Sequence, residues 1–335
     1  MINRPMDILQ LFPVRKTKDQ KQAFRNAVQI YAERLGYPVT VESGQFGSRN
    51  LVIGVPEGAS YLVSAHYDTC ARLPIPNLIV FHPLLIVLYQ CLFSCVMVLP
   101  SFLVGLGTMV VSIFYAFSSG FDTDSVTQIG TWSFLGVFIP LMVLTLFMLY
   151  CGPANKHNAN DNTSGVVTLL EIARTMPENQ RHKVCFVLFD LEEKGLLGSR
   201  DYRKAHKEQT DRQFILNLDC VGDGDHIMMF PTKKLKRDRK KLTTLYKACG
   251  YFGKKSIQIR EKGFSAYGSD QKRFPCGVGI CALRKGKLGL YLGRIHTHKD
   301  TILEETNVNI LRAALTSFIC CDAVNEERKM KNETV

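Results

Sequence analysis

KVCFVLFDLEEKG, at residues 183–195, is the stretch that decides the fold. Residues 183–189 form a near-continuous apolar run, as expected for a central strand of a parallel sheet. Two carboxylates, Glu192 and Glu193, and then Gly195, which permits a turn, follow directly. Ligands of an open α/β sheet gather beyond the carboxyl ends of its strands. The stretch therefore predicts an α/β fold with a functional site at that edge.

Other apolar runs lead into side chains that bind metals. Three predicted strands end just before such a side chain: residues 61–65 before His66, residues 214–218 before Asp219 and, less clearly, residues 290–295 before His296. A fourth metal-binding side chain, Asp161, instead opens a predicted helix. We therefore expect a mostly parallel central sheet flanked by helices, with these side chains at one edge.

Helical periodicity and strand-like runs complete the predicted domain. Apolar spacing predicts an amphipathic helix at residues 18–36, followed by strands at residues 39–42 and 50–54. A second helix should begin at Thr163 and Ser164, whose hydroxyls can cap it, and continue to residue 175. Asp300 and Thr301 are expected to cap the last helix, at residues 303–321.

A block of membrane-type sequence separates His66 from Asp161. Residues 73–121 contain no charged residue, and residues 131–151 form a second uncharged run. A spanning helix needs about 20 apolar residues. Pro83 and Pro100 can break or kink the first run, and an interfacial or re-entrant piece near residues 78–89 would absorb its excess length. We therefore expect an inserted transmembrane hairpin at residues 78–151, with residues 1–77 and 152–335 together forming one catalytic domain.

The functional halves constrain how the block crosses the membrane. If His66 and Asp161 share a metal site, the number of crossings is even, and two is the simplest number. The predicted loop at residues 118–130 carries Asp122 and Asp124 but no Lys or Arg, whereas Arg72 and Lys156 flank the block. The positive-inside rule then places the loop outside a cell membrane and the catalytic domain in the cytoplasm.

Charge and cysteine content exclude some classes of protein. The net charge of +12 favours anionic surroundings, and residues 233–241 hold seven basic residues in nine positions. That segment is expected to be a solvated helix face or a contact with membrane lipid. No aromatic residue interleaves its charges, so nucleic acid is not an expected partner. Eleven scattered cysteines fit reduced thiols rather than a disulfide framework.

Taken together, the five candidate ligands suit a pair of metal ions. One imidazole for each metal, a shared carboxylate and two terminal carboxylates form a suitable set of ligands for two zinc ions. Asp68, two residues after His66, can orient that imidazole by accepting its other N–H. Of the adjacent pair Glu192 and Glu193, one carboxylate can bind metal while the other serves as general base.

Six segments, in order, resemble the co-catalytic di-zinc aminopeptidases of metallopeptidase family 28. They are SAHYDT, NANDNTSGV, LFDLEEKGLLGS, NLDCVG, YGSDQKRF and IHTHKDT, and they cover essentially all of the chain outside the membrane block. NDNTSG and EEKGLLGS are the most specific. The resemblance implies a zinc-aminopeptidase fold, two zinc ions per chain and a peptide substrate with a free N-terminus.

The resemblance also implies roles for individual residues. His66 and either Glu193 or Asp219 would be terminal ligands, divided between the two zincs, with His296 on the second zinc. Asp161 would bridge the two zincs, and its peptide bond to the next residue is held cis in that family. Glu192 would be the general base, and Tyr267 would polarise the scissile carbonyl. His296 matches the family's HT..DT pattern, whereas His298 does not.

Three alternatives remain open at the level of sequence. A glutaminyl-cyclase-like acyltransferase of the same family would need one zinc. A non-catalytic binding module would be signalled by loss of a ligand, and no ligand is lost. A carboxypeptidase would need a basic pocket, which Arg273 or Arg294 could supply.

Family members are mostly secreted or lumenal, and the membrane insertion is not part of their usual pattern. We infer no oligomeric state.

Overall fold

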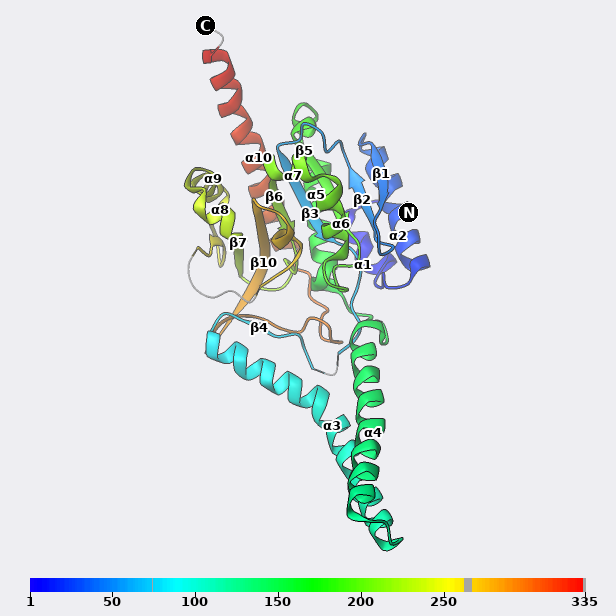
Figure 1. Cartoon of the computed structure of the whole chain (residues 1–335). Helices are drawn as coiled ribbons and strands as arrows, with labels where there is room; N and C mark the ends of the chain where they lie inside the picture. Colours follow the sequence, from blue (N-terminus) through cyan, green and yellow to red (C-terminus); the bar gives the residue numbers. More distant parts are fainter. Residues whose placement is uncertain (74, 262–266, 334–335) are drawn as a thin grey trace.

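A mixed, mostly parallel sheet forms the centre of the computed structural model, which describes residues 1–73, 75–261 and 267–333 (Figure 1). The strands along it run in the order β1-β2-β5-β3-β6-β10-β7-β9-β8. The four adjacent strands β5, β3, β6 and β10 are parallel. The bounds are β1 (Val39–Ser43), β2 (Arg49–Ile53), β3 (Tyr61–His66), β5 (Val184–Phe189), β6 (Phe214–Leu218), β7 (His226–Pro231), β8 (Gly250–Phe252), β9 (Lys255–Ile259) and β10 (Gly277–Gly286).

The apolar runs of the sequence form the buried strands, as predicted. Every residue of β3, β5 and β6 is buried, which explains why these segments read as continuous rather than alternating apolar runs. The predicted strand at residues 290–295 is wrong in extent, because β11 (Gly289–Leu292) ends earlier. Arg294 after it has a φ of 73°, in the left-handed region, so the backbone turns away from the sheet.

Helices cover both faces of the sheet. α2 (Lys18–Arg34), α5 (Gly165–Thr175) and α10 (Glu305–Glu333) share one apolar core with the sheet, whereas α6 (Leu197–Ala205) packs on the opposite face. α2 forms where the amphipathic pattern predicted a helix, and Thr17 and Gln20 form a capping box at its start. The shorter helices are α1 (Ile8–Leu11), α7 (Lys207–Arg212), α8 (Lys233–Arg237) and α9 (Arg239–Leu245).

Two long apolar helices extend from the domain as a hairpin. α3 (Pro83–Ser118) and α4 (Thr123–Cys151) pack side by side, and the most hydrophobic 18-residue stretch of each is only 11% and 0% buried, respectively. Large apolar side chains such as Val111, Phe114 and Trp132 are exposed to about 70% or more. A core helix of a soluble protein would bury such side chains. Both helices are therefore long and apolar enough to cross a membrane.

The hairpin differs from the expected one in its turn. The sequence predicted a loop at residues 118–130 and a second helix at residues 131–151, but α4 already begins at Thr123. The Asp122 carboxylate accepts hydrogen bonds from the backbone N–H groups of Asp124 and Ser125, and so caps α4 eight residues early. α3 is a single helix containing Pro100, and Figure 1 shows it passing beneath the domain before it turns to run alongside α4.

A short strand joins the hairpin to the central sheet. β4 (Ile79–Val80), just before α3, pairs with β11, which in turn pairs with β10 of the central sheet. Leu73 N–H donates to the carbonyl of His296, and Asn77 N–H donates to that of Ile295. The segment that leads into the apolar hairpin therefore lies against the loop that carries a predicted ligand.

Candidate metal centre

The carboxyl ends of three neighbouring strands bring predicted ligands together. His66 is the last residue of β3, Asp219 follows β6 directly, and Glu192 and Glu193 lie in the turn after β5. Because β5, β3 and β6 are adjacent and parallel, these residues meet at one edge of the sheet. Leu191 and Gly195 both have positive φ, so the strand has ended before the two glutamates, as the sequence required.

Asp161 lies in the turn at Ala159–Ser164, and neighbouring polar side chains fix this turn. The peptide bond Asp161–Asn162 is cis, which confirms that prediction. The Asn162 amide donates to the carbonyl of Leu218 and accepts from the N–H groups of Gly165 and Cys220. The turn is therefore bonded to the end of β6. The expected cap by Thr163 and Ser164 is wrong, because Asn162 provides the hydrogen bond to the start of α5.

Gly165 explains why the turn can lie so close to the sheet. A Cβ at this position would stand 2.4 Å from the carbonyl oxygen of Leu218 and 2.4 Å from the Asn162 side-chain oxygen. Neither group can move without breaking the hydrogen bonds that hold the turn. Glycine in NDNTSG is therefore required for the approach of α5 to β6, which keeps Asp161 beside Asp219.

The two oxygens of Asp161 face two different imidazoles. Oδ1 lies 3.4 Å from Nε2 of His66, and Oδ2 lies 3.0 Å from Nε2 of His296. Asp219 Oδ1 is 3.6 Å from the same nitrogen of His66, and Glu193 Oε2 is 3.5 Å from that of His296. The five predicted ligands thus divide into two groups that share Asp161.

These groups fit zinc by both distance and chemistry. Ligand atoms 2.0–2.1 Å from a tetrahedral zinc lie about 3.3 Å apart, and the four nitrogen–oxygen distances span 3.0–3.6 Å. The buried Glu193 Oε1 has no hydrogen-bond partner among the described residues, so it is free to bind a cation. His66, Asp161 and Asp219 would hold one ion, and His296, Asp161 and Glu193 the other.

The electrostatics of the site also favour cations. Burial raises the pKa of Glu193 to about 7 and raises that of Glu192 as well, and nearby carboxylates add to both shifts. Burial opposes protonation of His296, but Glu193 and Asp161 outweigh it and raise its pKa to about 9. Several carboxylates share this space with few positive side chains, so bound cations would offset the cost of burying them.

Asp68 positions the glutamate turn rather than mainly orienting His66. Its carboxylate accepts the backbone N–H groups of Glu192 at 3.0 Å and Glu193 at 3.2 Å. The His66 Nδ1 atom lies 3.2 Å from the Asp68 carbonyl oxygen and 3.6 Å from its carboxylate. The backbone of Asp68 is therefore the nearer partner of the imidazole, whereas its side chain fixes both glutamates.

Tyr267 lines the same cavity as the ligands. Its hydroxyl donates to the carbonyls of Asp219 at 3.3 Å and Ile280 at 3.4 Å, and burial raises its pKa, so the phenol stays protonated. A Cβ at Gly279 would stand 2.5 Å from the Tyr267 ring, so this glycine makes room for it. The proposed contact with a scissile carbonyl remains a prediction.

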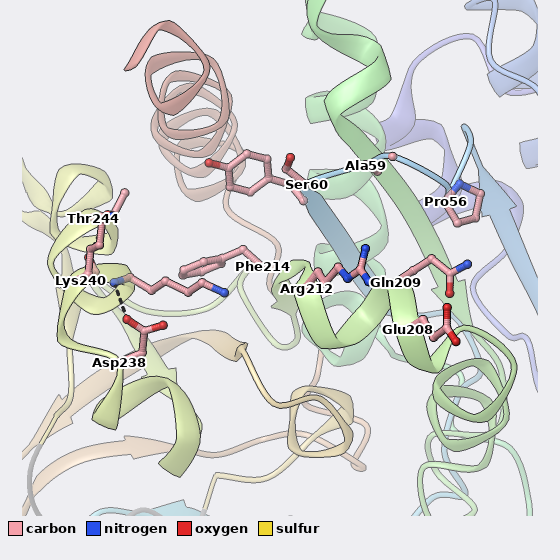
Figure 2. A pocket seen from close by; sticks show the side chains of 13 residues that line it. Pro56, Ala59, Ser60, Glu208, Gln209, Arg212, Phe214, Asp238, Lys240 and Thr244 are labelled. Carbon is pink, nitrogen blue, oxygen red and sulfur yellow. Dashed lines mark hydrogen bonds between the residues drawn. The ribbon is translucent and has the colours of Figure 1, made fainter. Parts of the chain in front are cut away.

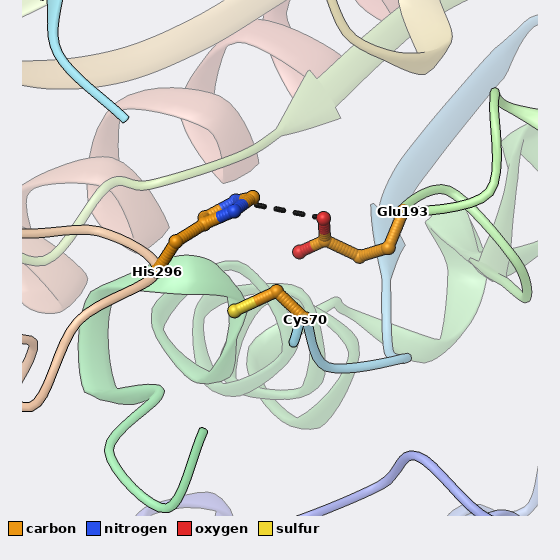
Figure 3. A group of neighbouring side chains, drawn as sticks. All are labelled: Cys70, Glu193 and His296. Atoms are coloured by element: carbon orange, nitrogen blue, oxygen red, sulfur yellow. Dashed lines mark ion pairs between the residues drawn. The ribbon is translucent and has the colours of Figure 1, made fainter. Parts of the chain in front are cut away.

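His296 lies on a loop, next to a thiol that sequence reasoning missed. Its φ of 62° is left-handed, and Figure 3 shows its ring facing Glu193, with Cys70 close to both. The ligand atoms of these three residues lie within 4.8 Å of one another. Cys70 follows the SAHYDT segment directly, but a lone cysteine gives no signal in the sequence. His298 is exposed and lies outside the cavity, as its mismatch to the pattern implied.

Asp300 has a role that the sequence did not indicate. We expected it to cap the last helix, but α10 begins only at Glu305. Its carboxylate instead accepts the N–H groups of Asn160 at 2.8 Å and Asp161 at 3.0 Å. Burial and the nearby Asp161 carboxylate raise the pKa of Asp300 to about 8. Asp300 therefore holds the bridging residue in place.

Basic side chains from the N-terminal region support the site from behind. The fully buried Arg15 donates to the carbonyl of Tyr67 and to the hydroxyl of Thr163. Lys21 pairs with the buried Asp190 at 2.7 Å, and Asp190 in turn accepts the N–H of Leu191 at the start of the glutamate turn. Sequence reasoning missed both cations, because nothing local to them marks their partners.

The ligands line a small cavity of about 100 Å³, which also includes Asn77 and Ile79 from the segment before α3. No Arg or Lys is among the described residues that line it. A separate cavity of about 610 Å³ lies at the opposite ends of the same strands, beside Tyr61 and Phe214 (Figure 2). Because ligands of such sheets bind at the carboxyl ends of the strands, we assign the chemistry to the smaller cavity.

Comparison with known proteins adds a family and a fold. Peptidase family M28 matches residues 142–317, just over half of the chain. Aminopeptidase YwaD of Bacillus subtilis is 42% identical over 67 residues, which span 19% of this chain and only 15% of that protein. The family match begins inside α4, so His66 and Asp68 lie outside it.

Two solved structures share the fold across nearly the whole chain. The glutaminyl cyclase of Porphyromonas gingivalis has a TM-score of 0.55 at 15% identity, covering 93% of each chain. A Zn-dependent exopeptidase from Parabacteroides distasonis has a TM-score of 0.53 at 16% identity, covering 92% of each chain. At these identities the likeness concerns the fold, and it agrees with the sheet and helices described above.

Proposed function

This chain belongs to peptidase family M28, and from that premise we propose that it is a membrane-anchored aminopeptidase that uses two zinc ions. The observation that carries the proposal is the division of the ligands around Asp161, whose two oxygens face His66 and His296 separately. A second carboxylate completes each group. A site for one ion would not need the second imidazole and the second terminal carboxylate.

The side chains around the ligands have distinct tasks in this proposal. When bound, zinc ions lower the pKa of a water and polarise a carbonyl. Glu192 lies within 4.8 Å of the ligand atoms of His66 and Asp219, where it can accept a proton from the attacking water and pass it to the leaving amine. The Tyr267 phenol would donate to the oxyanion. Glu192 and Asp219 would attract the free amine of the substrate.

A single-zinc glutaminyl cyclase remains the second candidate, because a glutaminyl cyclase shares this fold over 93% of both chains. The two reactions give different products. The cyclase would close an N-terminal glutamine on itself and release ammonia, whereas the peptidase would release the whole residue. The lining of the catalytic cavity gives no support to a carboxypeptidase, since its described residues include no Arg or Lys.

A product assay on purified full-length protein tests this function. The substrates are a panel of aminoacyl amides, their N-acetylated counterparts and a peptide with N-terminal glutamine. We expect hydrolysis of the free-amine substrates, none of the blocked ones, and release rather than cyclisation of glutamine. Cyclisation without hydrolysis would favour the acyltransferase, and release of C-terminal residues from blocked peptides would contradict aminopeptidase action.

A further inference from the structure

A large cavity lies where the membrane hairpin meets the catalytic domain. It measures about 1030 Å³, and we call it the interfacial cavity. One wall comes from the two hairpin helices, with Met97 of α3 and Leu144 and Met148 of α4. The other walls come from the segments before α3 and after β11. It lies outside the catalytic cavity and has no part in the reaction described above.

Three cations and no carboxylate line the interfacial cavity among the described residues. They are Arg72, Arg294 and Lys299. Arg72 and Lys299 are exposed and have no ion-pair partner in the described part of the chain. Arg294 is 3.7 Å from Asp223, but that carboxylate already accepts a closer hydrogen bond, at 2.7 Å, from Arg284. With Arg72 and Lys299 unpaired among the described residues, and Arg294 sharing the Asp223 carboxylate with Arg284, the cavity presents a net positive charge beside apolar side chains.

The position along α4 relates these two surfaces to a bilayer. Leu144 and Met148 lie within the last two turns of α4, which ends at Cys151, so they lie about 5–10 Å along the helix axis from its domain end. If the hairpin crosses a membrane, the apolar wall lies at the edge of the hydrocarbon nearest the domain. The three cations then lie at the level of the lipid headgroups. Basic side chains at that depth attract anionic lipid.

The cavity also shares a wall with the catalytic site. Leu292, Ile295 and His296 line the catalytic cavity, whereas Tyr291, Arg294 and Thr297 from the same strip line the interfacial one. Leu73, which also lines the interfacial cavity, donates its N–H to the carbonyl of His296 at 2.8 Å. A molecule in the interfacial cavity would therefore contact the loop that positions a proposed metal ligand.

We propose that the interfacial cavity binds one anionic phospholipid, with its phosphate against Arg72, Arg294 and Lys299 and an acyl chain along Met97, Leu144 and Met148. The proposal rests on the membrane insertion included in the proposed function, but not on the peptidase chemistry. The charge of the three side chains selects the headgroup, and the apolar wall distinguishes a lipid from free phosphate.

Native mass spectrometry of the full-length chain in a neutral detergent tests the proposal. We expect one saturably bound phosphatidylglycerol per chain and binding of phosphatidylcholine at least tenfold weaker. The double variant Arg72→Gln/Lys299→Gln should bind phosphatidylglycerol about tenfold more weakly. The matched control Lys240→Gln/Lys241→Gln removes the same charge far from the cavity and should bind as the unaltered chain does. Circular dichroism of each variant verifies folding.

Other outcomes would overturn the assignment. Equal losses of phosphatidylglycerol binding in the two double variants would show a general effect of charge. Equal binding of phosphatidylglycerol and phosphatidylcholine would show that the charge of the headgroup does not select the lipid. Displacement of the lipid by inorganic phosphate at the same concentration would indicate a free-anion site. Displacement by an acylated peptide, but not by its unacylated form, would assign the cavity to substrate. Glu192→Gln should lower turnover but leave lipid binding unchanged. Lipid binding is therefore measured independently of peptidase activity, and failure of one proposal would not be mistaken for failure of the other.

Discussion

Glu192 and Glu193 are neighbours in the sequence and both lie near His66, but their other partners differ. Glu193 Oε2 lies 3.5 Å from the His296 ring, whereas Glu192 groups with His66 and Asp219. Asp68 holds both backbone N–H groups, so the turn that separates the two carboxylates is fixed. The two residues should therefore fail in different ways when each loses its charge.

We predict that Glu192→Gln keeps both zinc ions and loses turnover by about 10²–10⁴-fold, as expected for loss of a general base. Glu193→Gln should instead lose one zinc. Turnover of an aminoacyl amide and elemental analysis of the same preparations measure the two effects. Each variant is the control for the other, because both remove one charge from the same turn. Reversed phenotypes would contradict the assignment.

Asp300 should matter although it is not a ligand. Its carboxylate accepts two backbone N–H groups, those of Asn160 and Asp161, and an amide would repel one of them. We predict that Asp300→Asn weakens zinc binding by about 10–100-fold, the usual effect of removing a group that supports a ligand. Chelator competition measures this affinity. Asp211→Asn, which removes an acid near the surface, is the control, and equal affinities of the two variants would refute the role.

At the scale of elements, the sequence predicted the bounds of the strands that are buried on both faces. It missed the bounds that depend on one residue's backbone conformation or capping hydrogen bond. β6 has the bounds that its apolar run indicated, and β5 differs from its run by one residue, because a strand buried on both faces carries its signature in every residue. The end of β11 and the start of α4 were wrong. Those boundaries depend on the left-handed Arg294 and on capping by Asp122, two local conformations that composition does not determine.

The residues of the candidate site also differ in whether the local sequence marks them. All five predicted ligands meet: His66, Glu193 and Asp219 lie at or just after strand ends, and Asp161 lies just before α5, as their local patterns indicated, whereas His296 lies on a loop beyond the end of β11. Asp300, Arg15 and Cys70 could not be found in this way. Their partners are distant in the chain, and only the packed structure brings them together.

The link between α6 and the edge of the sheet gives a prediction about pH. His206 Nε2 lies 2.9 Å from a carboxylate oxygen of Glu42 in β1, and this contact raises the pKa of His206 although burial opposes it. A raised pKa means that the pair stabilises the fold fully below about pH 6.5, the ordinary histidine value, and less as pH rises through the folded value.

We therefore expect Glu42→Gln to lower the melting temperature more at about pH 6 than at about pH 9. A pair with this exposure contributes up to about 1 kcal/mol, which corresponds to about 2–4 °C for a domain of this size. Scanning calorimetry at both pH values measures the difference. Glu178→Gln, whose partner Arg181 is an arginine and not a histidine, should show no such difference. The same deficit at both pH values would rule out a contribution from His206.

At the scale of the whole molecule, the hairpin leaves the domain and returns to it. Figure 1 shows the start of α3 and the end of α4 both beside the domain, and His66 Nε2 lies 3.4 Å from Asp161 Oδ1 although the insertion separates the two residues in the sequence. We propose two crossings with the catalytic domain in the cytoplasm. α8 and α9, which carry most of the basic stretch, lie away from the hairpin in Figure 1, so this arrangement does not support its contact with the same membrane.

Cysteine labelling tests the proposed orientation. In a background freed of reactive thiols, Ser125→Cys at the start of α4 should react with an impermeant reagent in intact cells. Lys234→Cys in α8 should react only after lysis. Labelling of the second variant in intact cells would reverse the orientation. Labelling of neither, before or after lysis, would contradict the crossings.

Zinc stoichiometry of the full-length protein tests the central claim most directly, because the claim is that one carboxylate divides the ligands into two groups. The protein is stripped with chelator, saturated with zinc and analysed after removal of loosely bound metal. We predict two zinc ions per chain, one in Asp219→Ala, and none tightly held in Asp161→Ala, since that carboxylate serves both groups. At most one tightly held zinc in the unaltered chain would contradict the paired site.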